Sequence, residues 1–350
     1  MACKHPLKAF VIGVRPDGKQ DLRIRPYAVN HLEFIHNRWV DVYIPDRGAF
    51  ADRAVYESIE IPCGKCIGCR LEYSRQWANR CMLELQYHKS SYFVTLTYDD
   101  EHVPIGYYAD PSTGEAKESM TLRKRDFQLF MKRLRKQTGQ DLRFFMAGEY
   151  GSQTFRPHYH AIIFGLELND LQFWKNSKLN YPYYNSPTID RAWSVLDKNK
   201  GSYAPLGYAV VAPVSWETCA YTARYTAKKN GTQDAKAYEE FGMEPPFTLM
   251  SRRPGIARQY YDDHPDLFDR EFINVSTEKG GRKFRPPKYF SNLYDVEYPE
   301  ASAKLKEIRK EMAKNLKAAK LEQTDLTYLE YLEVEEFNLS QRIKSLERKL

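Results

Sequence analysis

Residues 143–164 read RFFMAGEYGSQTFRPHYHAIIF, and this stretch decides the fold. Two segments rich in apolar and aromatic residues, 143–150 and 158–164, flank the turn-rich GSQTFRP. Such a pair predicts two antiparallel strands joined in a hairpin. If the connection centres near Gln153 and Thr154, Glu149 lies directly across from His158, at a cross-strand distance of about 5 Å.

The second of these strands carries His158-Tyr159-His160. Residues two apart on a strand point to the same face, so the two imidazoles are expected side by side. Two histidines and the Glu149 carboxylate could hold one divalent ion and leave coordination positions open for a substrate oxygen and water. The alternative is two ordinary polar residues on a half-exposed sheet. Arg156, just before the pair, would offer a guanidinium to a phosphate.

Further elements are expected on either side of this hairpin. Segments 92–98 (YFVTLTY) and 208–213 (YAVVAP) predict strands. Helices are expected from Leu71 to about Lys89, over 121–136 with Thr121 as N-cap, and from an N-cap at Ser215 through Lys229. Segments 166–205 and 230–298 show no clear period, whereas the charged last fifty residues predict one or two surface helices or a partner-binding tail.

The segment 221–229, YTARYTAKK, places two phenols on one side of a helix, since residues four apart share a face. Paired tyrosines usually serve packing, but here the residues between them are small or charged. A tyrosine oxygen can act as a covalent nucleophile when a metal ion polarises the electrophile. Tyr221 and Tyr225 are therefore candidate nucleophiles, with Lys228 and Lys229 placed to offset charge on a phosphate.

Six cysteines in a chain of this size indicate metal binding or free thiols more than a disulfide framework. Cys63-x2-Cys66-x2-Cys69, with Cys81 twelve residues on and Cys3 at the N-terminus, could bind a structural Zn²⁺. The overlapping spacing also resembles that of iron–sulfur proteins, and reduced thiols packed beside the Trp77 helix are a third alternative. Cys219 is expected in the core.

A basic run lies in the helix expected over 121–136. It predicts either a solvated charged face or sequence-independent contact with DNA phosphates. Its members are Arg123, Lys124, Arg125, Lys132, Arg133, Arg135 and Lys136.

Composition limits the function classes. The chain has 350 residues and a net charge of +7, and its mean hydropathy of −0.65 predicts no membrane span. The 26 tyrosines could stack on unpaired bases, although most are expected to serve packing. The chain has no GxxxxGK[ST] motif, so no ATP site is expected.

The FVTLTY strand, the His-hydrophobe-His strand and the Tyr-xxx-Tyr helix resemble, in that order, the three motifs of HUH endonucleases, the rolling-circle replication initiators. The chain is more closely similar to the replication initiation proteins of gokushovirus-type microviruses. This resemblance spans about residues 60–257 and is carried by CGKCIGC, FVTLTYDDEH, RDFQLFMKRLRK, GEYG, RPHYHAIIFG, YTARYTAKK and SRRPGIA.

The resemblance implies an α+β fold with a central antiparallel sheet flanked by helices. It implies His158 and His160 as ligands of Mg²⁺ or Mn²⁺, Tyr221 and Tyr225 as nucleophiles, and Lys228 or Lys229 as a phosphate-positioning residue. One tyrosine would nick the viral-strand origin, leaving a 5′-phosphotyrosyl link and a free 3′-OH, and the displaced strand would later be rejoined into a circle.

The implied partners are single-stranded or supercoiled phage DNA and the host helicase and polymerase, in the cytoplasm of the host bacterium, with no membrane. The expected division is 1–90 (strands and cysteines), 91–230 (endonuclease core with insertion 166–205), 231–298 (irregular) and 299–350 (helical). Two other functions stay open: a hydrolytic metallonuclease without a covalent intermediate, and a non-enzymatic DNA-binding or scaffolding protein.

Overall fold

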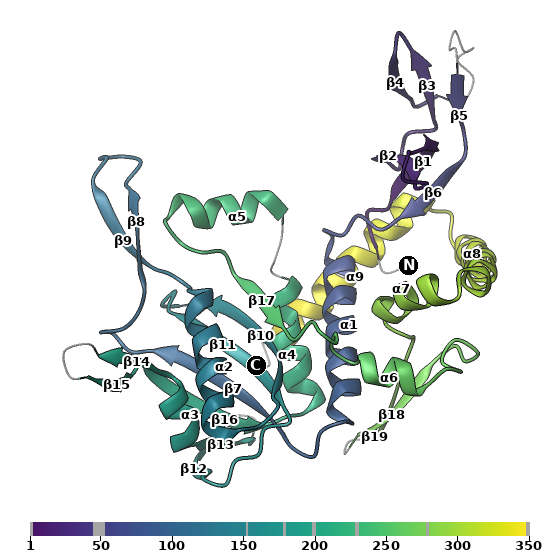
Figure 1. Ribbon diagram of the computed structural model, residues 1–350. Helices are drawn as coiled ribbons and strands as arrows, with labels where there is room; N and C mark the ends of the chain where they lie inside the picture. The colour runs from purple at the N-terminus through teal and green to yellow at the C-terminus, as the bar shows by residue number, and fades with distance from the viewer. Residues whose placement is uncertain are drawn as a thin grey trace. The chain divides into compact units, whose positions relative to one another are not determined.

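The computed structural model describes residues 3–44, 53–151, 153–177, 180–197, 201–227, 231–277 and 280–347 (Figure 1). The chain forms two compact units. One comprises Met1–Glu72 together with Ala303–Leu350, and the other comprises Tyr73–Ser302. None of the described helices is long and apolar enough to cross a membrane.

A seven-stranded sheet forms the centre of the Tyr73–Ser302 unit, and each strand in it runs antiparallel to its neighbours. Its spatial order is β12 (Gln172–Asn176), β13 (Pro182–Asn185), β16 (Gly207–Pro213), β7 (Ser91–Tyr98), β11 (Pro157–Phe164), β10 (Arg143–Tyr150) and β17 (Phe247–Met250). The four strands expected from the sequence are confirmed to within one residue. Strand β11, which carries the two histidines, lies between β7 and β10 inside the sheet.

Helices cover both faces of this sheet, because its inner strands are apolar on both sides. Tyr159, Ala161 and Ile163 pack in one core with α2 (Lys124–Thr138). Ile162 and Phe164 pack in a second core with α1 (Ile67–Leu85) and α4 (Trp216–Ala227). Helices α2 and α4 therefore lie on opposite faces of the sheet, as Figure 1 shows.

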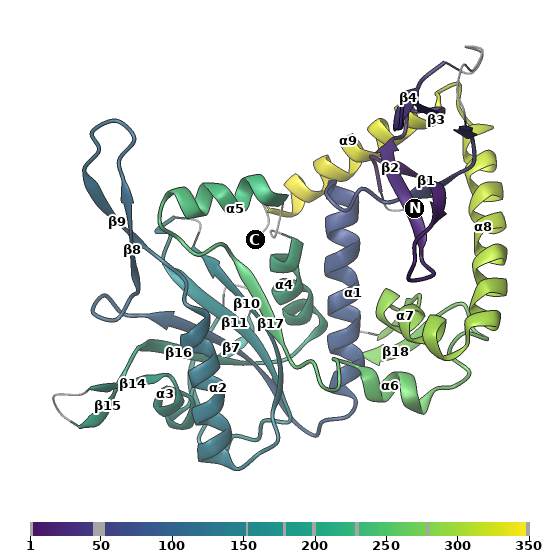
Figure 2. The same cartoon turned by 45° about the horizontal axis from the view of Figure 1, so that its top comes forward.

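The rest of this unit consists of hairpins and short helices. The hairpin of β8 (Ile105–Ala109) and β9 (Ala116–Met120) projects from the sheet, which is clear in Figure 2. The other elements are α3 (Pro187–Ala192), β14 (Ser194–Asp197), β15 (Ser202–Pro205), α5 (Gly231–Glu240), α6 (Arg258–Asp263), β18 (Ile273–Thr277), β19 (Gly280–Phe284) and α7 (Lys288–Glu297).

The other unit joins the two ends of the chain. Its strands form two three-stranded sheets, β2 (Gln20–Pro26), β1 (Leu7–Val14) and β6 (Ser58–Ile61), and β4 (Arg38–Val42), β3 (His31–Ile35) and β5 (Arg53–Val55). Its helices are α8 (Pro299–Leu321), from Ala303 on, and α9 (Tyr328–Glu347). Lys317 Nζ donates to Glu60 Oε2 at 3.1 Å and the Tyr328 hydroxyl to Glu60 Oε1 at 2.8 Å, so both helices are bonded to the N-terminal strands.

The two predicted N-caps had different outcomes. Ser215 caps α4 as expected: its Oγ accepts from the Thr218 N–H at 3.3 Å, and its own N–H donates to Thr218 Oγ1 at 2.9 Å. Thr121 as N-cap of α2 was wrong. That helix begins after Arg123, and Thr121 Oγ1 instead accepts the N–H of Glu244, 123 residues away in sequence.

The interpretation of 166–205 and 230–298 as segments without clear structure was also wrong. Strands β12, β13 and β17 from these segments extend both ends of the main sheet. They have only four or five residues each, too few to show a period, and they form because an existing strand offers its unpaired edge. The helical C-terminus is confirmed by α8 and α9.

Candidate functional site

The hairpin of β10 and β11 brings one carboxylate and two imidazoles together. Glu149 pairs with His158, as the sequence predicted, and Ala147 pairs with His160. Glu149 Oε1 lies 2.9 Å from His158 Nε2 and 3.0 Å from His160 Nε2. Glu149 and His160 are buried, with 4% and 6% of their surface exposed. One atom from each residue can therefore reach a single ion.

The other nitrogen of each imidazole has its own partner. His158 Nδ1 lies 3.1 Å from the carbonyl oxygen of Arg156, and since a carbonyl only accepts, Nδ1 must carry the proton. His160 Nδ1 lies 3.0 Å from the Thr95 hydroxyl on β7. Second partners of this kind fix the tautomer and the ring orientation of metal-binding histidines and leave the Nε2 lone pairs for the ion.

Tyr221 on α4 lies beside this group. Its ring packs edge-on to His160, with centroids 5.0 Å apart and planes at 81°. Phe93 contacts both rings: it stacks on His160 at 5.6 Å and meets Tyr221 edge-on at 6.1 Å. The guanidinium of Arg224 lies over the Tyr221 ring at 5.5 Å from its centroid. A phenol thus stands next to the three possible metal ligands, with a cation on its ring.

The other members of the predicted helix are only partly described. The backbone of Tyr225 lies in α4, four residues after Tyr221 and so on the same side of the helix. The predicted Lys228 and Lys229 lie outside the described residues.

Comparisons with known proteins agree with this arrangement. A family model for the replication-associated protein ORF2 matches residues 91–230. Replication-associated protein ORF2 of Spiroplasma virus 4 is 32% identical over 298 residues, which cover 83% of this chain and 85% of that protein. Replication-associated protein VP4 of Bdellovibrio phage phiMH2K is 30% identical over 271 residues, 73% of this chain and 75% of that protein.

The chain belongs to the replication-associated proteins of gokushovirus-type microviruses. The segment matched by the family model contains Glu149, His158, His160 and Tyr221. No solved structure matches this replication-associated protein significantly.

Tyr159, between the two histidines, points to the opposite face of the sheet. It is fully buried, its hydroxyl donates to the carbonyl oxygen of Arg123 at 2.9 Å, and it lies 2.8 Å from the Tyr98 hydroxyl. Burial raises the pKa of Tyr159 well above its ordinary value. Unlike Tyr221, this tyrosine is a protonated core residue of the replication-associated protein.

Arg156 already has partners within the chain. Its Nη1 donates to the carbonyl oxygen of Tyr98 at 2.9 Å, and its Nη2 pairs with the exposed carboxylate of Asp100. A phosphate contact by Arg156 would therefore replace Asp100.

The basic residues of α2 divide into two groups. Arg133 donates to the carbonyl oxygen of Ala192 at 2.7 Å, and Arg135 donates to that of Leu142 at 2.6 Å, so both tie the helix to its neighbours. Lys124 pairs with Glu244. The remaining cations are exposed and make no ion pair with a described residue: Arg123, Arg125, Lys132 and Lys136. They belong to the helix on the sheet face opposite Tyr221.

Four of the five candidate zinc ligands lie together. Their Sγ atoms are all within 4.8 Å of one another, and they are Cys3, Cys63, Cys66 and Cys69. The fifth, Cys81, is not part of this group: it is fully buried further along α1, in the same core as Cys219. The expectation that Cys219 is a core residue is confirmed.

The sequence interpretation did not include three residues of the site. Thr95 and Phe93 follow from alternation, because β7 pairs with β11 and sets Thr95 opposite His160 and Phe93 opposite Ile162. The neighbouring FVTLTY strand was recognised, but its register against the histidines was not. Arg224 stands between the two tyrosines in sequence and gave no signal of its own.

Proposed function

We propose that this protein initiates rolling-circle replication by nicking the viral-strand origin through attack of a tyrosine on a DNA phosphate. The observation that carries the proposal is the contact between the Tyr221 and His160 rings, next to the atoms that Glu149 and His158 turn toward the same point. A nucleophile beside an open set of metal ligands is what phosphodiester transfer requires. Family membership supports the same role.

We propose that Glu149, His158 and His160 hold one Mg²⁺ or Mn²⁺ ion. The donor set fits such an ion: one carboxylate oxygen and two imidazole nitrogens converge, and each imidazole is fixed through its Nδ1. Three protein ligands leave positions for phosphate oxygens and water. When bound, the ion would polarise the scissile phosphate and offset the charge that develops on it.

The residues of the chain would act as follows. The Tyr221 oxygen attacks phosphorus as its phenolic proton leaves, and the bond from phosphorus to the 3′ oxygen breaks. The freed 3′ oxygen takes up a proton, and the 5′ phosphate stays on the tyrosine as a diester. Arg224, over the Tyr221 ring, stabilises the phenolate form of the attacking group. The diester bond is kept, so rejoining needs no nucleotide cofactor.

Tyr225 is proposed as the second nucleophile. One tyrosine would hold the 5′ end of the displaced strand while the other cleaves the regenerated origin, and the new 3′-OH would then attack the first adduct. Two phenols on one side of α4 can reach one site in turn. Lys228 and Lys229 are proposed to position the phosphate.

We propose residues 91–230 as the HUH-type endonuclease core, with single-stranded or supercoiled phage origin DNA as substrate. Host helicase and polymerase would extend the 3′ end, in the cytoplasm of the host bacterium. Segments 1–90 and 299–350 would then serve other roles, and the exposed cations of α2 would contact DNA backbone phosphates.

The test is a denaturing gel of the protein incubated with Mn²⁺ and a single-stranded origin oligonucleotide labelled on the 3′ side of the nick. The expected result is a protein-linked label that survives denaturation. Tyr221→Phe and Tyr225→Phe should each lose part of the nicking-and-joining cycle, and the double variant should form no adduct. Mass spectrometry of a phosphotyrosyl peptide would identify the residue.

Two outcomes overturn the proposal. Cleavage without any adduct, unaffected by the double variant, would mean that water is the nucleophile and the enzyme is a hydrolytic nuclease. No cleavage of any origin oligonucleotide with either ion, together with DNA binding, would mean a non-enzymatic DNA-binding protein.

A further inference from the structure

Four cysteines converge in the unit that joins the chain termini. Cys3 precedes β1, Cys63 and Cys66 lie between β6 and α1, and Cys69 is in the first turn of α1. All six cysteines of the chain are free thiols. Cys3 and Cys66 are buried and the other two are half-buried, so this group is a packed feature and not four surface thiols.

The distances between the sulfurs are those of ligands around one ion. Cys63 Sγ and Cys69 Sγ are 4.0 Å apart, and Cys66 Sγ and Cys3 Sγ are 3.9 Å apart. A disulfide needs about 2.05 Å. Four sulfurs at about 2.3 Å from a tetrahedral Zn²⁺ lie about 3.8 Å from each other. Because all four fall within 4.8 Å, they enclose one ion and not a cluster of several irons.

Backbone N–H groups point at these sulfurs, as they do in the outer shell of a thiolate site. They come from Lys4 to Cys66 at 3.2 Å, from Cys63 to Cys3 at 3.3 Å, and from Lys65 and Cys66 to Cys63 at 3.4 and 3.3 Å. Gly64 has φ +74°, a left-handed conformation that turns the chain between Cys63 and Cys66. Such N–H groups favour the charged thiolate over the thiol.

We infer that Cys3, Cys63, Cys66 and Cys69 bind one Zn²⁺ ion in a closed tetrathiolate site. Four protein ligands leave no position for substrate, so the ion is structural. It links Cys3 to Cys63, sixty residues away, across the strands of this unit. Among the described residues, the buried apolar cluster there consists of Phe10, Ile12, Val29 and Leu32, and so small a core needs a staple of this kind.

The test is metal analysis of the full-length protein, purified under reducing conditions and dialysed against EDTA. We expect one zinc per chain, released when an organomercurial reagent titrates the thiols. Reconstitution with Co²⁺ should give thiolate charge-transfer bands and the visible bands of tetrahedral cobalt. The His158→Ala/His160→Ala variant should keep its zinc, which separates this site from the proposed catalytic one.

Cys69→Ser should lose the zinc, Cys69→His should keep it, and Cys219→Ala, a matched change at a buried thiol outside the group, should leave it at one per chain. Zinc unaffected by Cys69→Ser, four thiols free without metal, or iron with sulfide would each overturn the inference. If Cys69→Ser fails to fold, the cobalt spectrum of the wild type decides alone.

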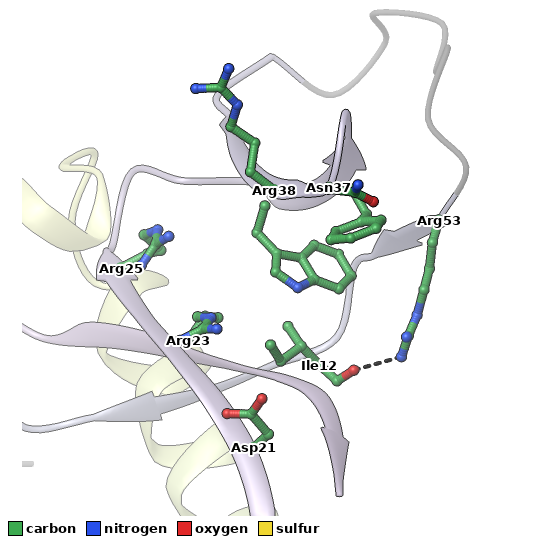
Figure 3. Close-up of a pocket in the computed structure, with 9 residues that line it drawn as sticks. Ile12, Asp21, Arg23, Arg25, Asn37, Arg38 and Arg53 are labelled. Atoms are coloured by element: carbon green, nitrogen blue, oxygen red, sulfur yellow. Dashed lines mark hydrogen bonds between the residues drawn. The ribbon is translucent and has the colours of Figure 1, made fainter. Parts of the chain in front are cut away.

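A different observation in the same unit supports a second inference. A pocket of about 600 Å³ lies among residues of β2, β3, β4 and β5 and their neighbours (Figure 3). Four arginines and two aromatic rings line it against one carboxylate, and these residues are Arg23, Arg25, Arg38, Arg53, Phe34, Trp39 and Asp21.

Two of the four arginines are already engaged. Arg25 pairs with Asp41 at 2.5 Å, and Arg53 donates to the carbonyl oxygen of Ile12 at 2.6 Å, the bond drawn in Figure 3. Arg23 and Arg38 are exposed and make no ion pair with a described residue. Trp39 packs on Phe34 at 5.2 Å and is only half-buried.

We propose that this pocket binds a nucleotide of single-stranded DNA, a proposal that rests on the proposed function. Unpaired arginines suit phosphates, and an indole offers a stacking surface to a base that is not paired. Paired bases in a duplex could not reach such a ring, so the pocket favours single strands.

The test is fluorescence anisotropy with a labelled single-stranded oligonucleotide, with a duplex and a free mononucleotide as comparisons. Arg23→Glu/Arg38→Glu should weaken single-strand binding about tenfold or more and should reduce the salt slope by about 1.4, about 0.7 for each phosphate that is no longer neutralised. The control is Lys304→Glu/Lys314→Glu, the same charge change at exposed positions of α8. Trp39→Ala should also weaken binding, whereas Trp39→Phe should largely preserve it.

Equal binding by both double variants would overturn this proposal, as would a preference for duplex. Its failure is distinct from failure of the proposed function, because adduct formation on a short oligonucleotide that carries only the nick site should persist in Arg23→Glu/Arg38→Glu. Loss of all adduct in the wild type would instead refute the nicking mechanism.

Discussion

Two groups of residues in this protein can hold a metal ion, and they differ in almost every chemical respect. The group in the N-terminal strands has four soft sulfurs held by backbone N–H groups, with no position left for substrate. The group on β10 and β11 has one carboxylate and two imidazoles, with a tyrosine ring beside it. Ligand number and softness thus distinguish a site built for stability from a site built for reaction.

Side-chain partners sharpen the difference. The sulfurs accept from main-chain donors, which depend on the fold and not on any one side chain. His160 depends on the hydroxyl of Thr95, and Tyr221 lies under the guanidinium of Arg224. We therefore expect single substitutions to affect reaction at the second group and folding at the first.

The largest effect is expected at the histidines. His158→Ala and His160→Ala should each lower the rate of origin nicking about 1000-fold, because several kcal/mol of transition-state stabilisation come from the ion they would hold. Single-turnover assays with excess enzyme measure this, and circular dichroism should show an unchanged fold. A variant that nicks at the wild-type rate would remove this group from the reaction.

Chelation should separate the two groups directly. EDTA is expected to abolish nicking while the thermal unfolding midpoint changes by a few degrees at most, and Mn²⁺ or Mg²⁺ should restore activity. An organomercurial reagent should instead lower the unfolding midpoint, because a structural zinc site stabilises the fold. Unfolding by EDTA without thiol modification would reverse the assignment of structural and catalytic roles.

A smaller effect is expected at Thr95. Thr95→Val removes the hydroxyl next to His160 Nδ1, and loss of such a partner costs about 10–100-fold in metal affinity or activity. Titration of nicking with Mn²⁺ measures the shift, and Thr95→Ser, which keeps the hydroxyl, should behave like the wild type. Equal behaviour of the valine and serine variants would show that this contact does not orient the imidazole.

The smallest effect on reaction is expected one residue from the histidines. Tyr159→Phe removes a buried hydroxyl that bonds Arg123 and Tyr98, which should cost about 1–3 kcal/mol of unfolding free energy. Its rate of nicking should stay within about twofold, since Tyr159 points away from the candidate site. Urea unfolding and the oligonucleotide assay together test it, and a large loss of rate in a folded protein would contradict the two-sided interpretation of β11.

The sequence was sufficient for the central hairpin. Alternation on a strand and a symmetric connection set Glu149 opposite His158, and the register confirms it. Ser215 was also predictable, because an N-cap depends on residues within one turn of helix. In each case the deciding interactions are local, so neighbouring residues suffice to specify them.

Long-range contacts decided what the sequence left open. Thr121 bonds a partner 123 residues away instead of capping α2, and the short strands β12, β13 and β17 formed only because the sheet offered them an edge. The same holds for the cysteines. Spacing offered five candidate ligands, and the fold brought Cys3 to three of them while α1 carried Cys81 into a different core.

The sequence by itself therefore determined the central hairpin, the order of the motifs and the residues that could carry chemistry. Only the tertiary structure decided which of those residues meet: Tyr221 with His160, Thr95 with His160, and Cys3 with Cys63, Cys66 and Cys69. The physical reason is that these contacts join segments far apart in the chain. Packing of the two cores and the pairing of β7 with β11 fix them, and no local pattern encodes either.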